Sequence, residues 1–542
     1  MEKGEKIPKV SPAILSDPYV KHLQEVIEKI LLELRSSKKR IEELEQEIAK
    51  LKKVPSKPVI KPSELDKEKP DDTNKEKQKR AGSEKRKKKK NLPIDETRKV
   101  KAKEVPKGWR LVGYKPYVVQ DIIIRRNNIK YEREVWESPD GHQRITAELP
   151  LGIASRDFGE QIRRYVINLY NECHVTQPII HSHLLNLGVD ISAGTVNFIL
   201  NEDKANEVFG KELLEVVEAG IAQSQEIRTD DTGARHKGKN GFCNCINTDL
   251  FTYFVSTYSK SRINFLSILQ VKHKDYHLNE VALSYFETQQ LSPKYMDVLS
   301  LHQGIILDSE EALSQFLENL KFTAKYAVRI ITEGLMIGSL VAHGFDQNKV
   351  IHSDGARQFN LFNHALCWKH AERPLVKLRF HNDIQQKQWE EKMDAFWQLY
   401  RDLKEYKILD AVQQNEQKPK LEEQFRLLCK RVENFEGLNN VLEILNNKKQ
   451  ELLMVLEYSF TSLHNNTTEG QIREFAKRRK ISGSTRSDKG RKSRDVFTSL
   501  KKTCKKLGVP FWDYLLDRIK GEFKIPPLVD ILSKRSEIAL NS

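Results

Sequence analysis

Residues 225–233 read QEIRTDDTG, and this stretch decides the fold. The short run 225–229 ends there in two adjacent carboxylates, Asp230 and Asp231, and Thr232 and Gly233 follow them. Residues 241–247 and 250–257 have the composition of two further strands joined by a turn at 248–249. The pattern predicts a first strand with an acidic end that continues into a β-hairpin.

The combination of a short strand and a carboxylate recurs further along the chain. Residues 349–353 form another short apolar run, which stops at Asp354. Glu469 lies where Asn466 can cap a helix and place Glu469 in its first turn. An acidic strand followed by a hairpin is what a ribonuclease-H-like sheet has at its start. We therefore expect an α/β, ribonuclease-H-like core with helical insertions.

Three carboxylates are a sensible minimum for metal-dependent cleavage and transfer of phosphodiesters. That chemistry needs two hard cations about 3.5 to 4 Å apart, and oxygen ligands suit Mg²⁺. Asp230, Asp354 and Glu469 are far apart in the sequence, so only the fold can bring them together. From the residues alone, a cap at a turn or strand end is the commoner role for each aspartate.

The N-terminal region has a different character. Apolar residues of 23–51 fall in two interleaved seven-residue series, which predict a coiled coil over residues 1–51 and a homo-oligomer; a single amphipathic helix is the alternative. Residues 52–106 have the composition of a disordered basic linker. The basic run at 75–90 could contact DNA phosphates or act as a solvated tether.

Order is expected to resume at a small β-rich unit, residues 107–150. Its predicted strands are Tyr117–Ile124 and Ile129–Trp136, with a turn at 138–141. Residues 151–215 then read as helices, with a break at Gly188 and a helix over 193–200. That spacing is typical of a DNA-binding helix-turn-helix, whose second helix would offer Thr195 and Asn197 to a base edge. An ordinary helical hairpin has the same spacing.

The bulk composition favours a polyanionic partner. The chain has 92 Lys and Arg against 76 acidic residues, a net charge of +16. It contains neither a signal peptide nor an apolar run long enough for a membrane span, so a cytoplasmic location is expected. Its six cysteines are scattered and are expected to be reduced. Cys243 and Cys245 would share one face of a strand, but no second pair lies nearby to complete a zinc site.

Several motifs, in order, carry a family resemblance. They are Tyr117-Val118-Val119-Gln120-Asp121, Ser138-Pro139-Asp140-Gly141, Ala147-Glu148-Leu149-Pro150, Asp230-Asp231-Thr232-Gly233, Ser259-Lys260-Ser261-Arg262, Asp354-Gly355, Cys367-Trp368-Lys369-His370-Ala371-Glu372-Arg373, Glu469-Gly470-Gln471-Ile472-Arg473 and Arg479-Lys480-Ile481-Ser482-Gly483-Ser484. Together they resemble the bacterial DDE transposases of the insertion sequence sixty-six family over roughly residues 110–520. Asp231 stands where that family usually has Glu, and Gly470 where it usually has Arg.

The resemblance implies a DNA transposase that cleaves and joins strands at the ends of an insertion sequence. Asp230, Asp354 and Glu469 would be its catalytic residues and would bind two Mg²⁺ or Mn²⁺ ions; Asp231 stays open as an alternative first ligand. The partners would be double-stranded DNA, as terminal inverted repeats and target, and accessory proteins of the same element, in a nucleoid-associated setting in bacteria. No cysteine precedes Cys173, so the zinc-binding segment that is common in the family is not expected here.

The resemblance also suggests the remaining boundaries. The catalytic core would span residues 216–500, with helical insertions at about 264–345 and 380–460, and a helical tail would follow at 501–542. Residues 477–494 are strongly basic, and Arg473, Arg479, Lys480 and Arg486 are candidate DNA contacts. A solvated loop is the alternative.

Two questions stay open at this stage. Cys367 and His370 could be metal ligands or a nucleophile pair, although packing near Asp354 is favoured. The chain could also be an inactive DNA-binding accessory protein or repressor derived from a transposase, or a ribonuclease-H-like nuclease that cuts without joining.

Overall fold

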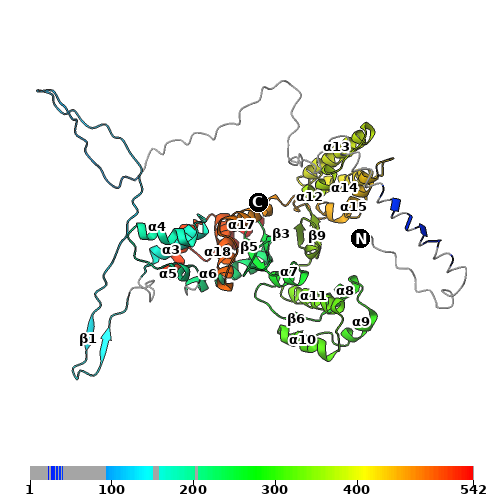
Figure 1. Cartoon of the computed structure of the whole chain (residues 1–542), viewed down its shortest axis with the longest axis horizontal. Helices are drawn as coiled ribbons and strands as arrows, with labels where there is room; N and C mark the ends of the chain where they lie inside the picture. Colours follow the sequence, from blue (N-terminus) through cyan, green and yellow to red (C-terminus); the bar gives the residue numbers. More distant parts are fainter. Residues whose placement is uncertain are drawn as a thin grey trace.

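The structure, a computed structural model, describes residues 93–149, 158–201 and 205–540, together with scattered positions between 22 and 40. The coiled coil predicted for 23–51 and the basic run at 75–90 lie outside the described residues, apart from those positions. The described chain has a mixed α/β architecture with a central mixed sheet and many helices (Figure 1). None of its described helices is long and apolar enough to cross a membrane.

Within the described residues the central sheet has five strands in the order β5-β4-β3-β8-β9. Their bounds are β3 (Glu226–Gly233), β4 (Phe242–Asn247), β5 (Thr252–Thr257), β8 (Val350–Ser353) and β9 (Asn363–Leu366). The first three form the antiparallel meander that the sequence predicts, and β8 and β9 run parallel to β3. This order, with these strand directions, is compatible with a ribonuclease-H-like core.

Different elements cover the two faces of the sheet. Helix α17 (Asn466–Ser482) packs on one face, where its Phe475 stacks on Phe254 with ring centroids 5.6 Å apart. Cys243 and Cys245 are buried in the same small apolar cluster, so they are packing residues. The other face joins the main hydrophobic core with helices α6 (Ala205–Gln223), α7 (Arg262–Leu269) and α11 (Lys325–Ala342).

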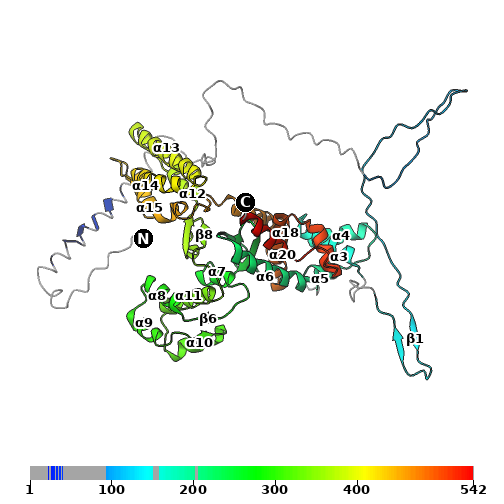
Figure 2. The same cartoon turned by 180° about the vertical axis from the view of Figure 1, so that it is seen from behind.

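Helix α18 (Asp488–Leu507) lies along the outer strand β5 and covers its edge (Figure 1). Helix α6 also contacts α18, as the view from behind shows (Figure 2). The backbone N–H groups of Thr252, Phe254 and Ser256 donate to side-chain oxygens of α18, at 3.2, 2.9 and 2.8 Å. A bare strand edge invites pairing with another chain. The helix removes that liability by occupying the unpaired donors.

The helices before and after the sheet pack against each other. They are α3 (Glu160–Asn171), α4 (Gln177–Asn186) and α5 (Ala193–Asn201) before it, and α19 (Phe511–Lys520) and α20 (Leu528–Leu540) after it. Helix α19 contacts α3, and α20 contacts α6. The helices expected around 158–170 and 193–200 are thus present, with Gly188 at the break in a left-handed conformation, φ +76°.

Two helical groups interrupt the sheet. The first contains β6 (Tyr276–His277), α8 (Glu280–Thr288), α9 (Pro293–Ser300), β7 (Ile306–Leu307), α10 (Glu310–Asn319) and α11, followed after β8 by the short turn η1 (Arg357–Phe359). The second contains α12 (Trp368–Val376), α13 (Asp383–Tyr406), α14 (Ala411–Leu428), α15 (Glu436–Asn446), α16 (Lys449–Leu452) and the turn η2 (Met454–Leu456). Each group buries its own hydrophobic cluster, which explains how such long segments fold beside the sheet (Figure 1).

The small β unit differs from the prediction. A hairpin forms from β1 (Val135–Glu137) and β2 (Arg144–Thr146), whereas Tyr117–Ile124 is not a strand. The turn predicted at 138–141 is correct, and Gly141 adopts φ +69° within it. The apolar residues of 117–124 have high intrinsic strand propensity, but that propensity acts through packing against neighbouring strands. They are exposed here and pair with no other described strand.

Candidate active site

Asp230 and Asp354 come from neighbouring parallel strands. Asp230 lies in β3, and Asp354 follows directly after β8. The register aligns Arg228 with His352, so positions two residues further along each strand lie side by side. The carboxyl ends of β3 and β8 therefore bring these two aspartates together on one face.

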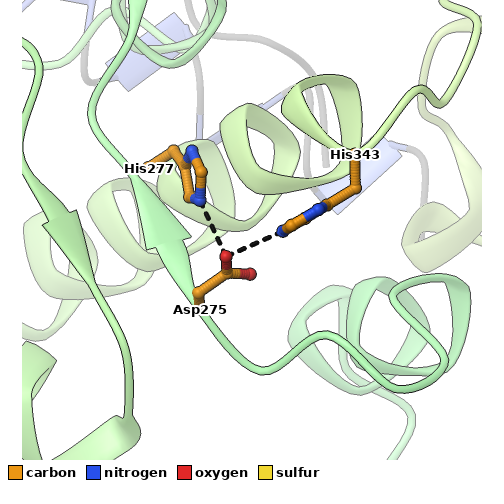
Figure 3. A group of neighbouring side chains, drawn as sticks. All are labelled: Asp275, His277 and His343. Atoms are coloured by element: carbon orange, nitrogen blue, oxygen red, sulfur yellow. Dashed lines mark hydrogen bonds and ion pairs between the residues drawn. The ribbon is translucent and has the colours of Figure 1, made fainter.

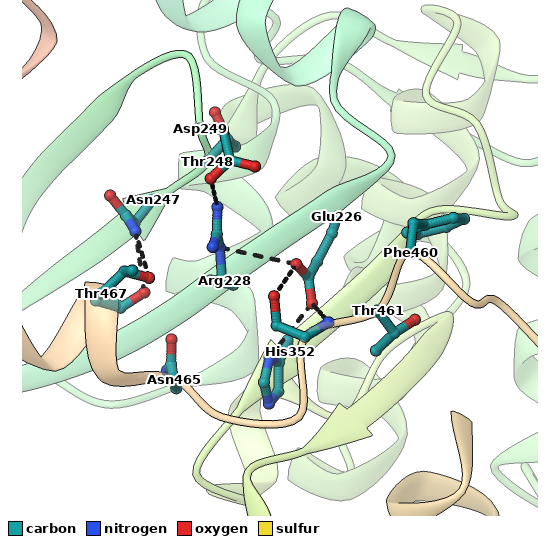
Figure 4. Close-up of polar contacts among 12 residues, drawn as sticks. Glu226, Arg228, Asn247, Thr248, Asp249, His352, Phe460, Thr461, Asn465 and Thr467 are labelled. Atoms are coloured by element: carbon teal, nitrogen blue, oxygen red, sulfur yellow. Dashed lines mark hydrogen bonds and ion pairs between the residues drawn. The ribbon is translucent and has the colours of Figure 1, made fainter. Parts of the chain in front are cut away.

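Glu469 approaches from the helix that covers this face. It lies in the first turn of α17, and that end of the helix is tied to the sheet. The Asn465 side chain donates to the Thr229 carbonyl at 2.8 Å. Asn247 donates to the hydroxyls of Thr467 and Thr468 at 3.3 Å each (Figure 4). These contacts direct the first turn of α17 toward the ends of β3 and β8.

The charges of Asp354 and Glu469 affect the pKa of Asp230. Burial raises the pKa of Asp230, and the charges of Asp354, Asp231 and Glu469 raise it further, to about 7, against a hydrogen bond from the Asp231 N–H. Like charges raise a carboxyl pKa only when they are close. The structure thus places Asp354 and Glu469 close enough to Asp230 for their charges to act on it. Carboxylate oxygens are the ligands that hard divalent cations prefer.

The adjacent Asp231 has a different role. Its carboxylate is ion-paired with Lys260, and it accepts a hydrogen bond from the Gln358 side chain at 2.9 Å. Successive side chains of a strand point to opposite faces. Of the two adjacent aspartates, Asp230 is therefore the one that shares the α17 face with Asp354.

Two basic side chains of α12 lie beside Glu469. His370 Nδ1 and Arg373 Nη2 are 3.7 and 3.6 Å from the same carboxylate oxygen, Oε1. Burial and the charge of Arg373 lower the pKa of His370 despite the neighbouring carboxylates. Arg373 is half exposed, so its guanidinium can also reach a bound phosphate.

Cys367 is a positioning residue in this geometry. Its buried Sγ accepts a hydrogen bond from the Asn465 N–H at 3.3 Å, next to the contact that holds α17. Burial raises the pKa of the thiol, which keeps it protonated and unsuited to nucleophilic attack. This environment favours the packing interpretation of Cys367 over a nucleophile pair with His370.

A buried polar network lies behind the carboxylates (Figure 4). Glu226 of β3 accepts hydrogen bonds from the Ser462 N–H and hydroxyl at 2.8 and 2.7 Å, and it lies 3.3 Å from His352 Nδ1 and 3.8 Å from Arg228 Nε. Burial raises the pKa of Glu226, but the contacts with His352, Arg228 and Ser462 outweigh it and bring the pKa to about 2. The network joins β3, β8 and the loop before α17. Sequence reasoning missed it; alternating charges within a buried strand were the available signal.

The predicted DNA contacts fall into two groups. Arg473, Lys480 and Arg486 are exposed in or just after α17, the helix of Glu469. Arg479 lies nearby, but its guanidinium donates to the Gly233 carbonyl. On α5, the Thr195 hydroxyl bonds to Ser192 at 2.9 Å, and Asn197 accepts from Asn201 at 2.7 Å. Whether these residues bind DNA stays a prediction.

The basic stretch at 477–494 is less exposed than its sequence suggests. Arg478 and Arg494 are buried, with only 2% and 6% of their surface exposed. Arg478 lies over the Tyr170 ring at 4.4 Å, and Arg494 bonds to Ser482 at 3.1 Å. Part of this charge therefore holds α17, α18 and α3 together.

Comparison with known proteins identifies the family. The model of the Transposase IS66 family matches residues 329–493, a stretch that contains Asp354 and Glu469. An uncharacterized protein, y4jO, of Sinorhizobium fredii (strain NBRC 101917 / NGR234) is 38% identical over 328 residues, covering 59% of this chain and the whole of that relative. The chain belongs to the IS66 transposase family. The resemblance indicated by its motifs is thereby confirmed. No solved structure matches this chain.

Membership of a DDE transposase family implies the use of a divalent metal. The three carboxylates of this IS66 transposase are of the kind that such a metal needs, because each offers oxygen ligands and the charges of Asp354 and Glu469 act on Asp230. Asp230 lies outside the stretch that the family model matches, so its inclusion rests on the register of β3 with β8.

Proposed function

We propose that this IS66-family transposase catalyses metal-dependent DNA cleavage and strand transfer at the ends of an insertion sequence. Asp230, Asp354 and Glu469 are the proposed catalytic residues and metal ligands. What supports the proposal is the strand register that aligns Asp230 with Asp354, together with the position of Glu469 in the first turn of the helix that covers this face of the sheet. Besides burial, the charges of Asp354 and Glu469 also raise the pKa of Asp230.

The proposed chemistry divides between ions and side chains. Two Mg²⁺ or Mn²⁺ ions held by the carboxylates would activate the attacking oxygen and stabilise the leaving oxygen. The two aspartates fix the ligand positions from a rigid sheet, and α17 supplies the third. Arg373 lies 3.6 Å from Glu469 and is placed to neutralise phosphate charge beside it. In this scheme water cleaves at the element end, and the freed 3′-hydroxyl attacks the target strand.

The proposed DNA path uses surfaces around this site. Exposed Arg473, Lys480 and Arg486 would attract the phosphate backbone, and α4 with α5 would act as a helix-turn-helix, with Asn197 on its exposed side. The partners would be terminal inverted repeats and target DNA, with accessory proteins of the same element. A homo-oligomer through residues 23–51 and a cytoplasmic, nucleoid-associated location complete the proposal.

A strand-transfer assay with labelled terminal repeats tests the proposal. We expect Asp354→Asn to reduce joined product by more than about 100-fold, because even residues that only support a metal ligand contribute 10- to 100-fold. DNA affinity, measured by gel shift, should be retained. Asp402→Asn, at a partly exposed position of helix α13, is the matched control and should join DNA normally.

The same assay separates the alternatives. Undiminished joining by Asp354→Asn would remove that residue from the site. Wild-type protein that binds ends but neither cuts nor joins them with Mg²⁺ or Mn²⁺ would favour an accessory protein or repressor. Metal-dependent cutting without joined product would favour a nuclease.

A further inference from the structure

Asp275, His277 and His343 meet in the first helical group, in a cluster separate from the three carboxylates (Figure 3). Asp275 and His277 belong to the loop and short strand at β6, and His343 directly follows the last residue of α11. One potential ligand atom of each residue lies within 4.8 Å of the others. Both imidazoles point at the same carboxylate oxygen: His277 Nε2 and His343 Nε2 are 2.8 and 2.7 Å from Asp275 Oδ2.

The carboxylate of this cluster is held in a fixed orientation. Its other oxygen, Oδ1, accepts a hydrogen bond from the Ser339 hydroxyl at 2.7 Å. Gln270 in turn donates to the Ser339 hydroxyl at 3.0 Å and to the Asp275 backbone carbonyl at 2.9 Å. Such outer contacts are characteristic of metal sites, because they orient a ligand and leave its second oxygen free to coordinate.

The cluster is also tied to the main core. The His273 ring stacks on His343 with centroids 3.7 Å apart, and its Nε2 lies 3.3 Å from a carboxylate oxygen of Glu218 on α6. A small cavity of about 70 Å³ lies against His273, Ser339 and His343. The side chains of His343 and Asp275 are 31% and 21% exposed, so solvent reaches the cluster.

Two imidazoles and one carboxylate suit a different ion from the one expected at the carboxylate site. Mg²⁺ prefers oxygen ligands, whereas imidazole suits Zn²⁺ and related transition metals. Zinc sites with three protein ligands keep a fourth position for water. With ligands about 2.05 Å from a tetrahedral ion, neighbouring donor atoms lie about 3.3 Å apart. Each imidazole nitrogen would therefore move about half an ångström away from Asp275 Oδ2, and the two nitrogens already lie within 4.8 Å of each other.

We propose that Asp275, His277 and His343 form a binding site for a zinc-like divalent transition metal. The ion would join β6 to the end of α11. Only residues 343–349 separate α11 from β8. Metal binding therefore fixes the end of α11, from which the chain leads into β8 and to Asp354. The site is independent of the proposed strand-transfer chemistry and does not rely on it.

Titration of the full-length protein tests the site. Protein stripped with a chelator is titrated with Zn²⁺ by calorimetry in excess Mg²⁺, so that the carboxylate cluster is already occupied. One equivalent of Zn²⁺ is expected to bind and to raise the melting temperature. Co²⁺ in place of Zn²⁺ is expected to give the visible absorption of a nitrogen-ligated site.

Two variants and two controls make the outcome decisive. His343→Asn, at a partly exposed position, and the near-isosteric Asp275→Asn should each weaken Zn²⁺ binding by at least about tenfold and abolish the Co²⁺ absorption. His302→Gln, in the same helical group, and Asp354→Asn should bind like the wild type. If the wild type binds no Zn²⁺, or if His343→Asn binds it equally well with the same absorption, the proposal is wrong and the cluster is an ion-paired carboxylate only. If Asp354→Asn alone abolishes binding, the ion belongs to the carboxylate site instead.

Discussion

At the residue scale, two neighbouring aspartates can have unrelated environments. Asp231 is neutralised by Lys260 and bonded to Gln358, whereas Asp230 shares its surroundings with two further carboxylates. The pKa of Asp230, raised by burial and by those charges, reflects mutual repulsion that a bound cation would relieve. The chemistry of the site thus depends on the alternation of side chains along a single strand.

Asp495 provides a pH-dependent test at the same scale. Its carboxylate accepts hydrogen bonds from the Ser256 N–H at 2.8 Å and from the Ser256 hydroxyl at 2.9 Å, at the edge of β5. Burial raises the pKa of Asp495 to about 7, although these bonds and two arginines oppose the rise. A carboxyl whose pKa is higher in the folded state binds more protons there than in the unfolded state. Its contribution to stability is complete below pH 4 and is lost as the pH rises through about 7.

The prediction compares Asp495→Asn with the wild type by urea unfolding at pH 6 and pH 8. Asparagine resembles the protonated acid, since it can accept from the Ser256 N–H and donate to the hydroxyl. The wild type should lose about 1 kcal/mol more stability than the variant between these two pH values. If the free energy of unfolding changes equally with pH in the two proteins, ionisation of Asp495 does not destabilise the folded state, and the prediction is wrong.

At the scale of elements, the start of α17 decides where Glu469 lies. Asn465 is buried, and its side chain satisfies the Thr229 carbonyl of β3. Asn465→Ala leaves that carbonyl without its partner, which should lower the free energy of unfolding by about 1 to 3 kcal/mol. Because the contact also positions the helix, strand transfer by the folded variant should fall while its DNA affinity is unchanged.

Denaturant unfolding and the joining assay, both at a temperature where the variant is folded, measure these effects. Asn446→Ala, at the exposed end of α15, is the control and should change neither quantity. Wild-type joining by Asn465→Ala would mean that other contacts suffice to position Glu469.

Elements set by local pattern were predictable from the sequence. The strands around Asp230 were expected from strand-like segments joined by a turn, and the helix after Ser192 from a capping signal; both form where expected. The hairpin was misplaced, because the strand propensity of 117–124 required a partner strand that the sequence does not specify. Likewise, a count of basic residues could not tell that Arg478 faces the interior, since its direction depends on packing against Tyr170.

The candidate site was predictable only in part, for the same physical reason. Motifs identified Asp230, Asp354 and Glu469, but their proximity arises from pairing between strands far apart in the sequence. The charges around Glu226 are visible in the sequence, but the roles of Glu226 and Asn465 are not, because each acts through a partner more than two hundred residues away. Contacts of such long range become visible only in the folded chain.

At the scale of the whole molecule, a buried ion pair joins the helices before the sheet to those after it. Glu212 of α6 accepts hydrogen bonds from Arg518 at 2.8 and 2.9 Å, from the Tyr514 hydroxyl at 2.8 Å and from the Leu528 N–H at 2.9 Å. Burial raises the pKa of Glu212, but these four bonds outweigh it and the pKa lies below its ordinary value. The carboxylate is therefore ionised and fully bonded inside the protein.

Glu212→Gln should weaken the attachment of the C-terminal helices α19 and α20 to α6. The amide cannot accept all four bonds, and the Arg518 charge keeps only one of its two buried carboxylate partners, Asp517, so the cost should approach about 3 kcal/mol. Thermal unfolding should show a lower midpoint, and hydrogen exchange should speed up first in α19 and α20. Lys520→Gln, which removes only the solvent-accessible pair with Glu522, should leave both measurements nearly unchanged. Equal exchange rates in the Glu212→Gln variant and the wild type would mean that apolar packing of α20 on α6 holds the C-terminal helices without this ion pair.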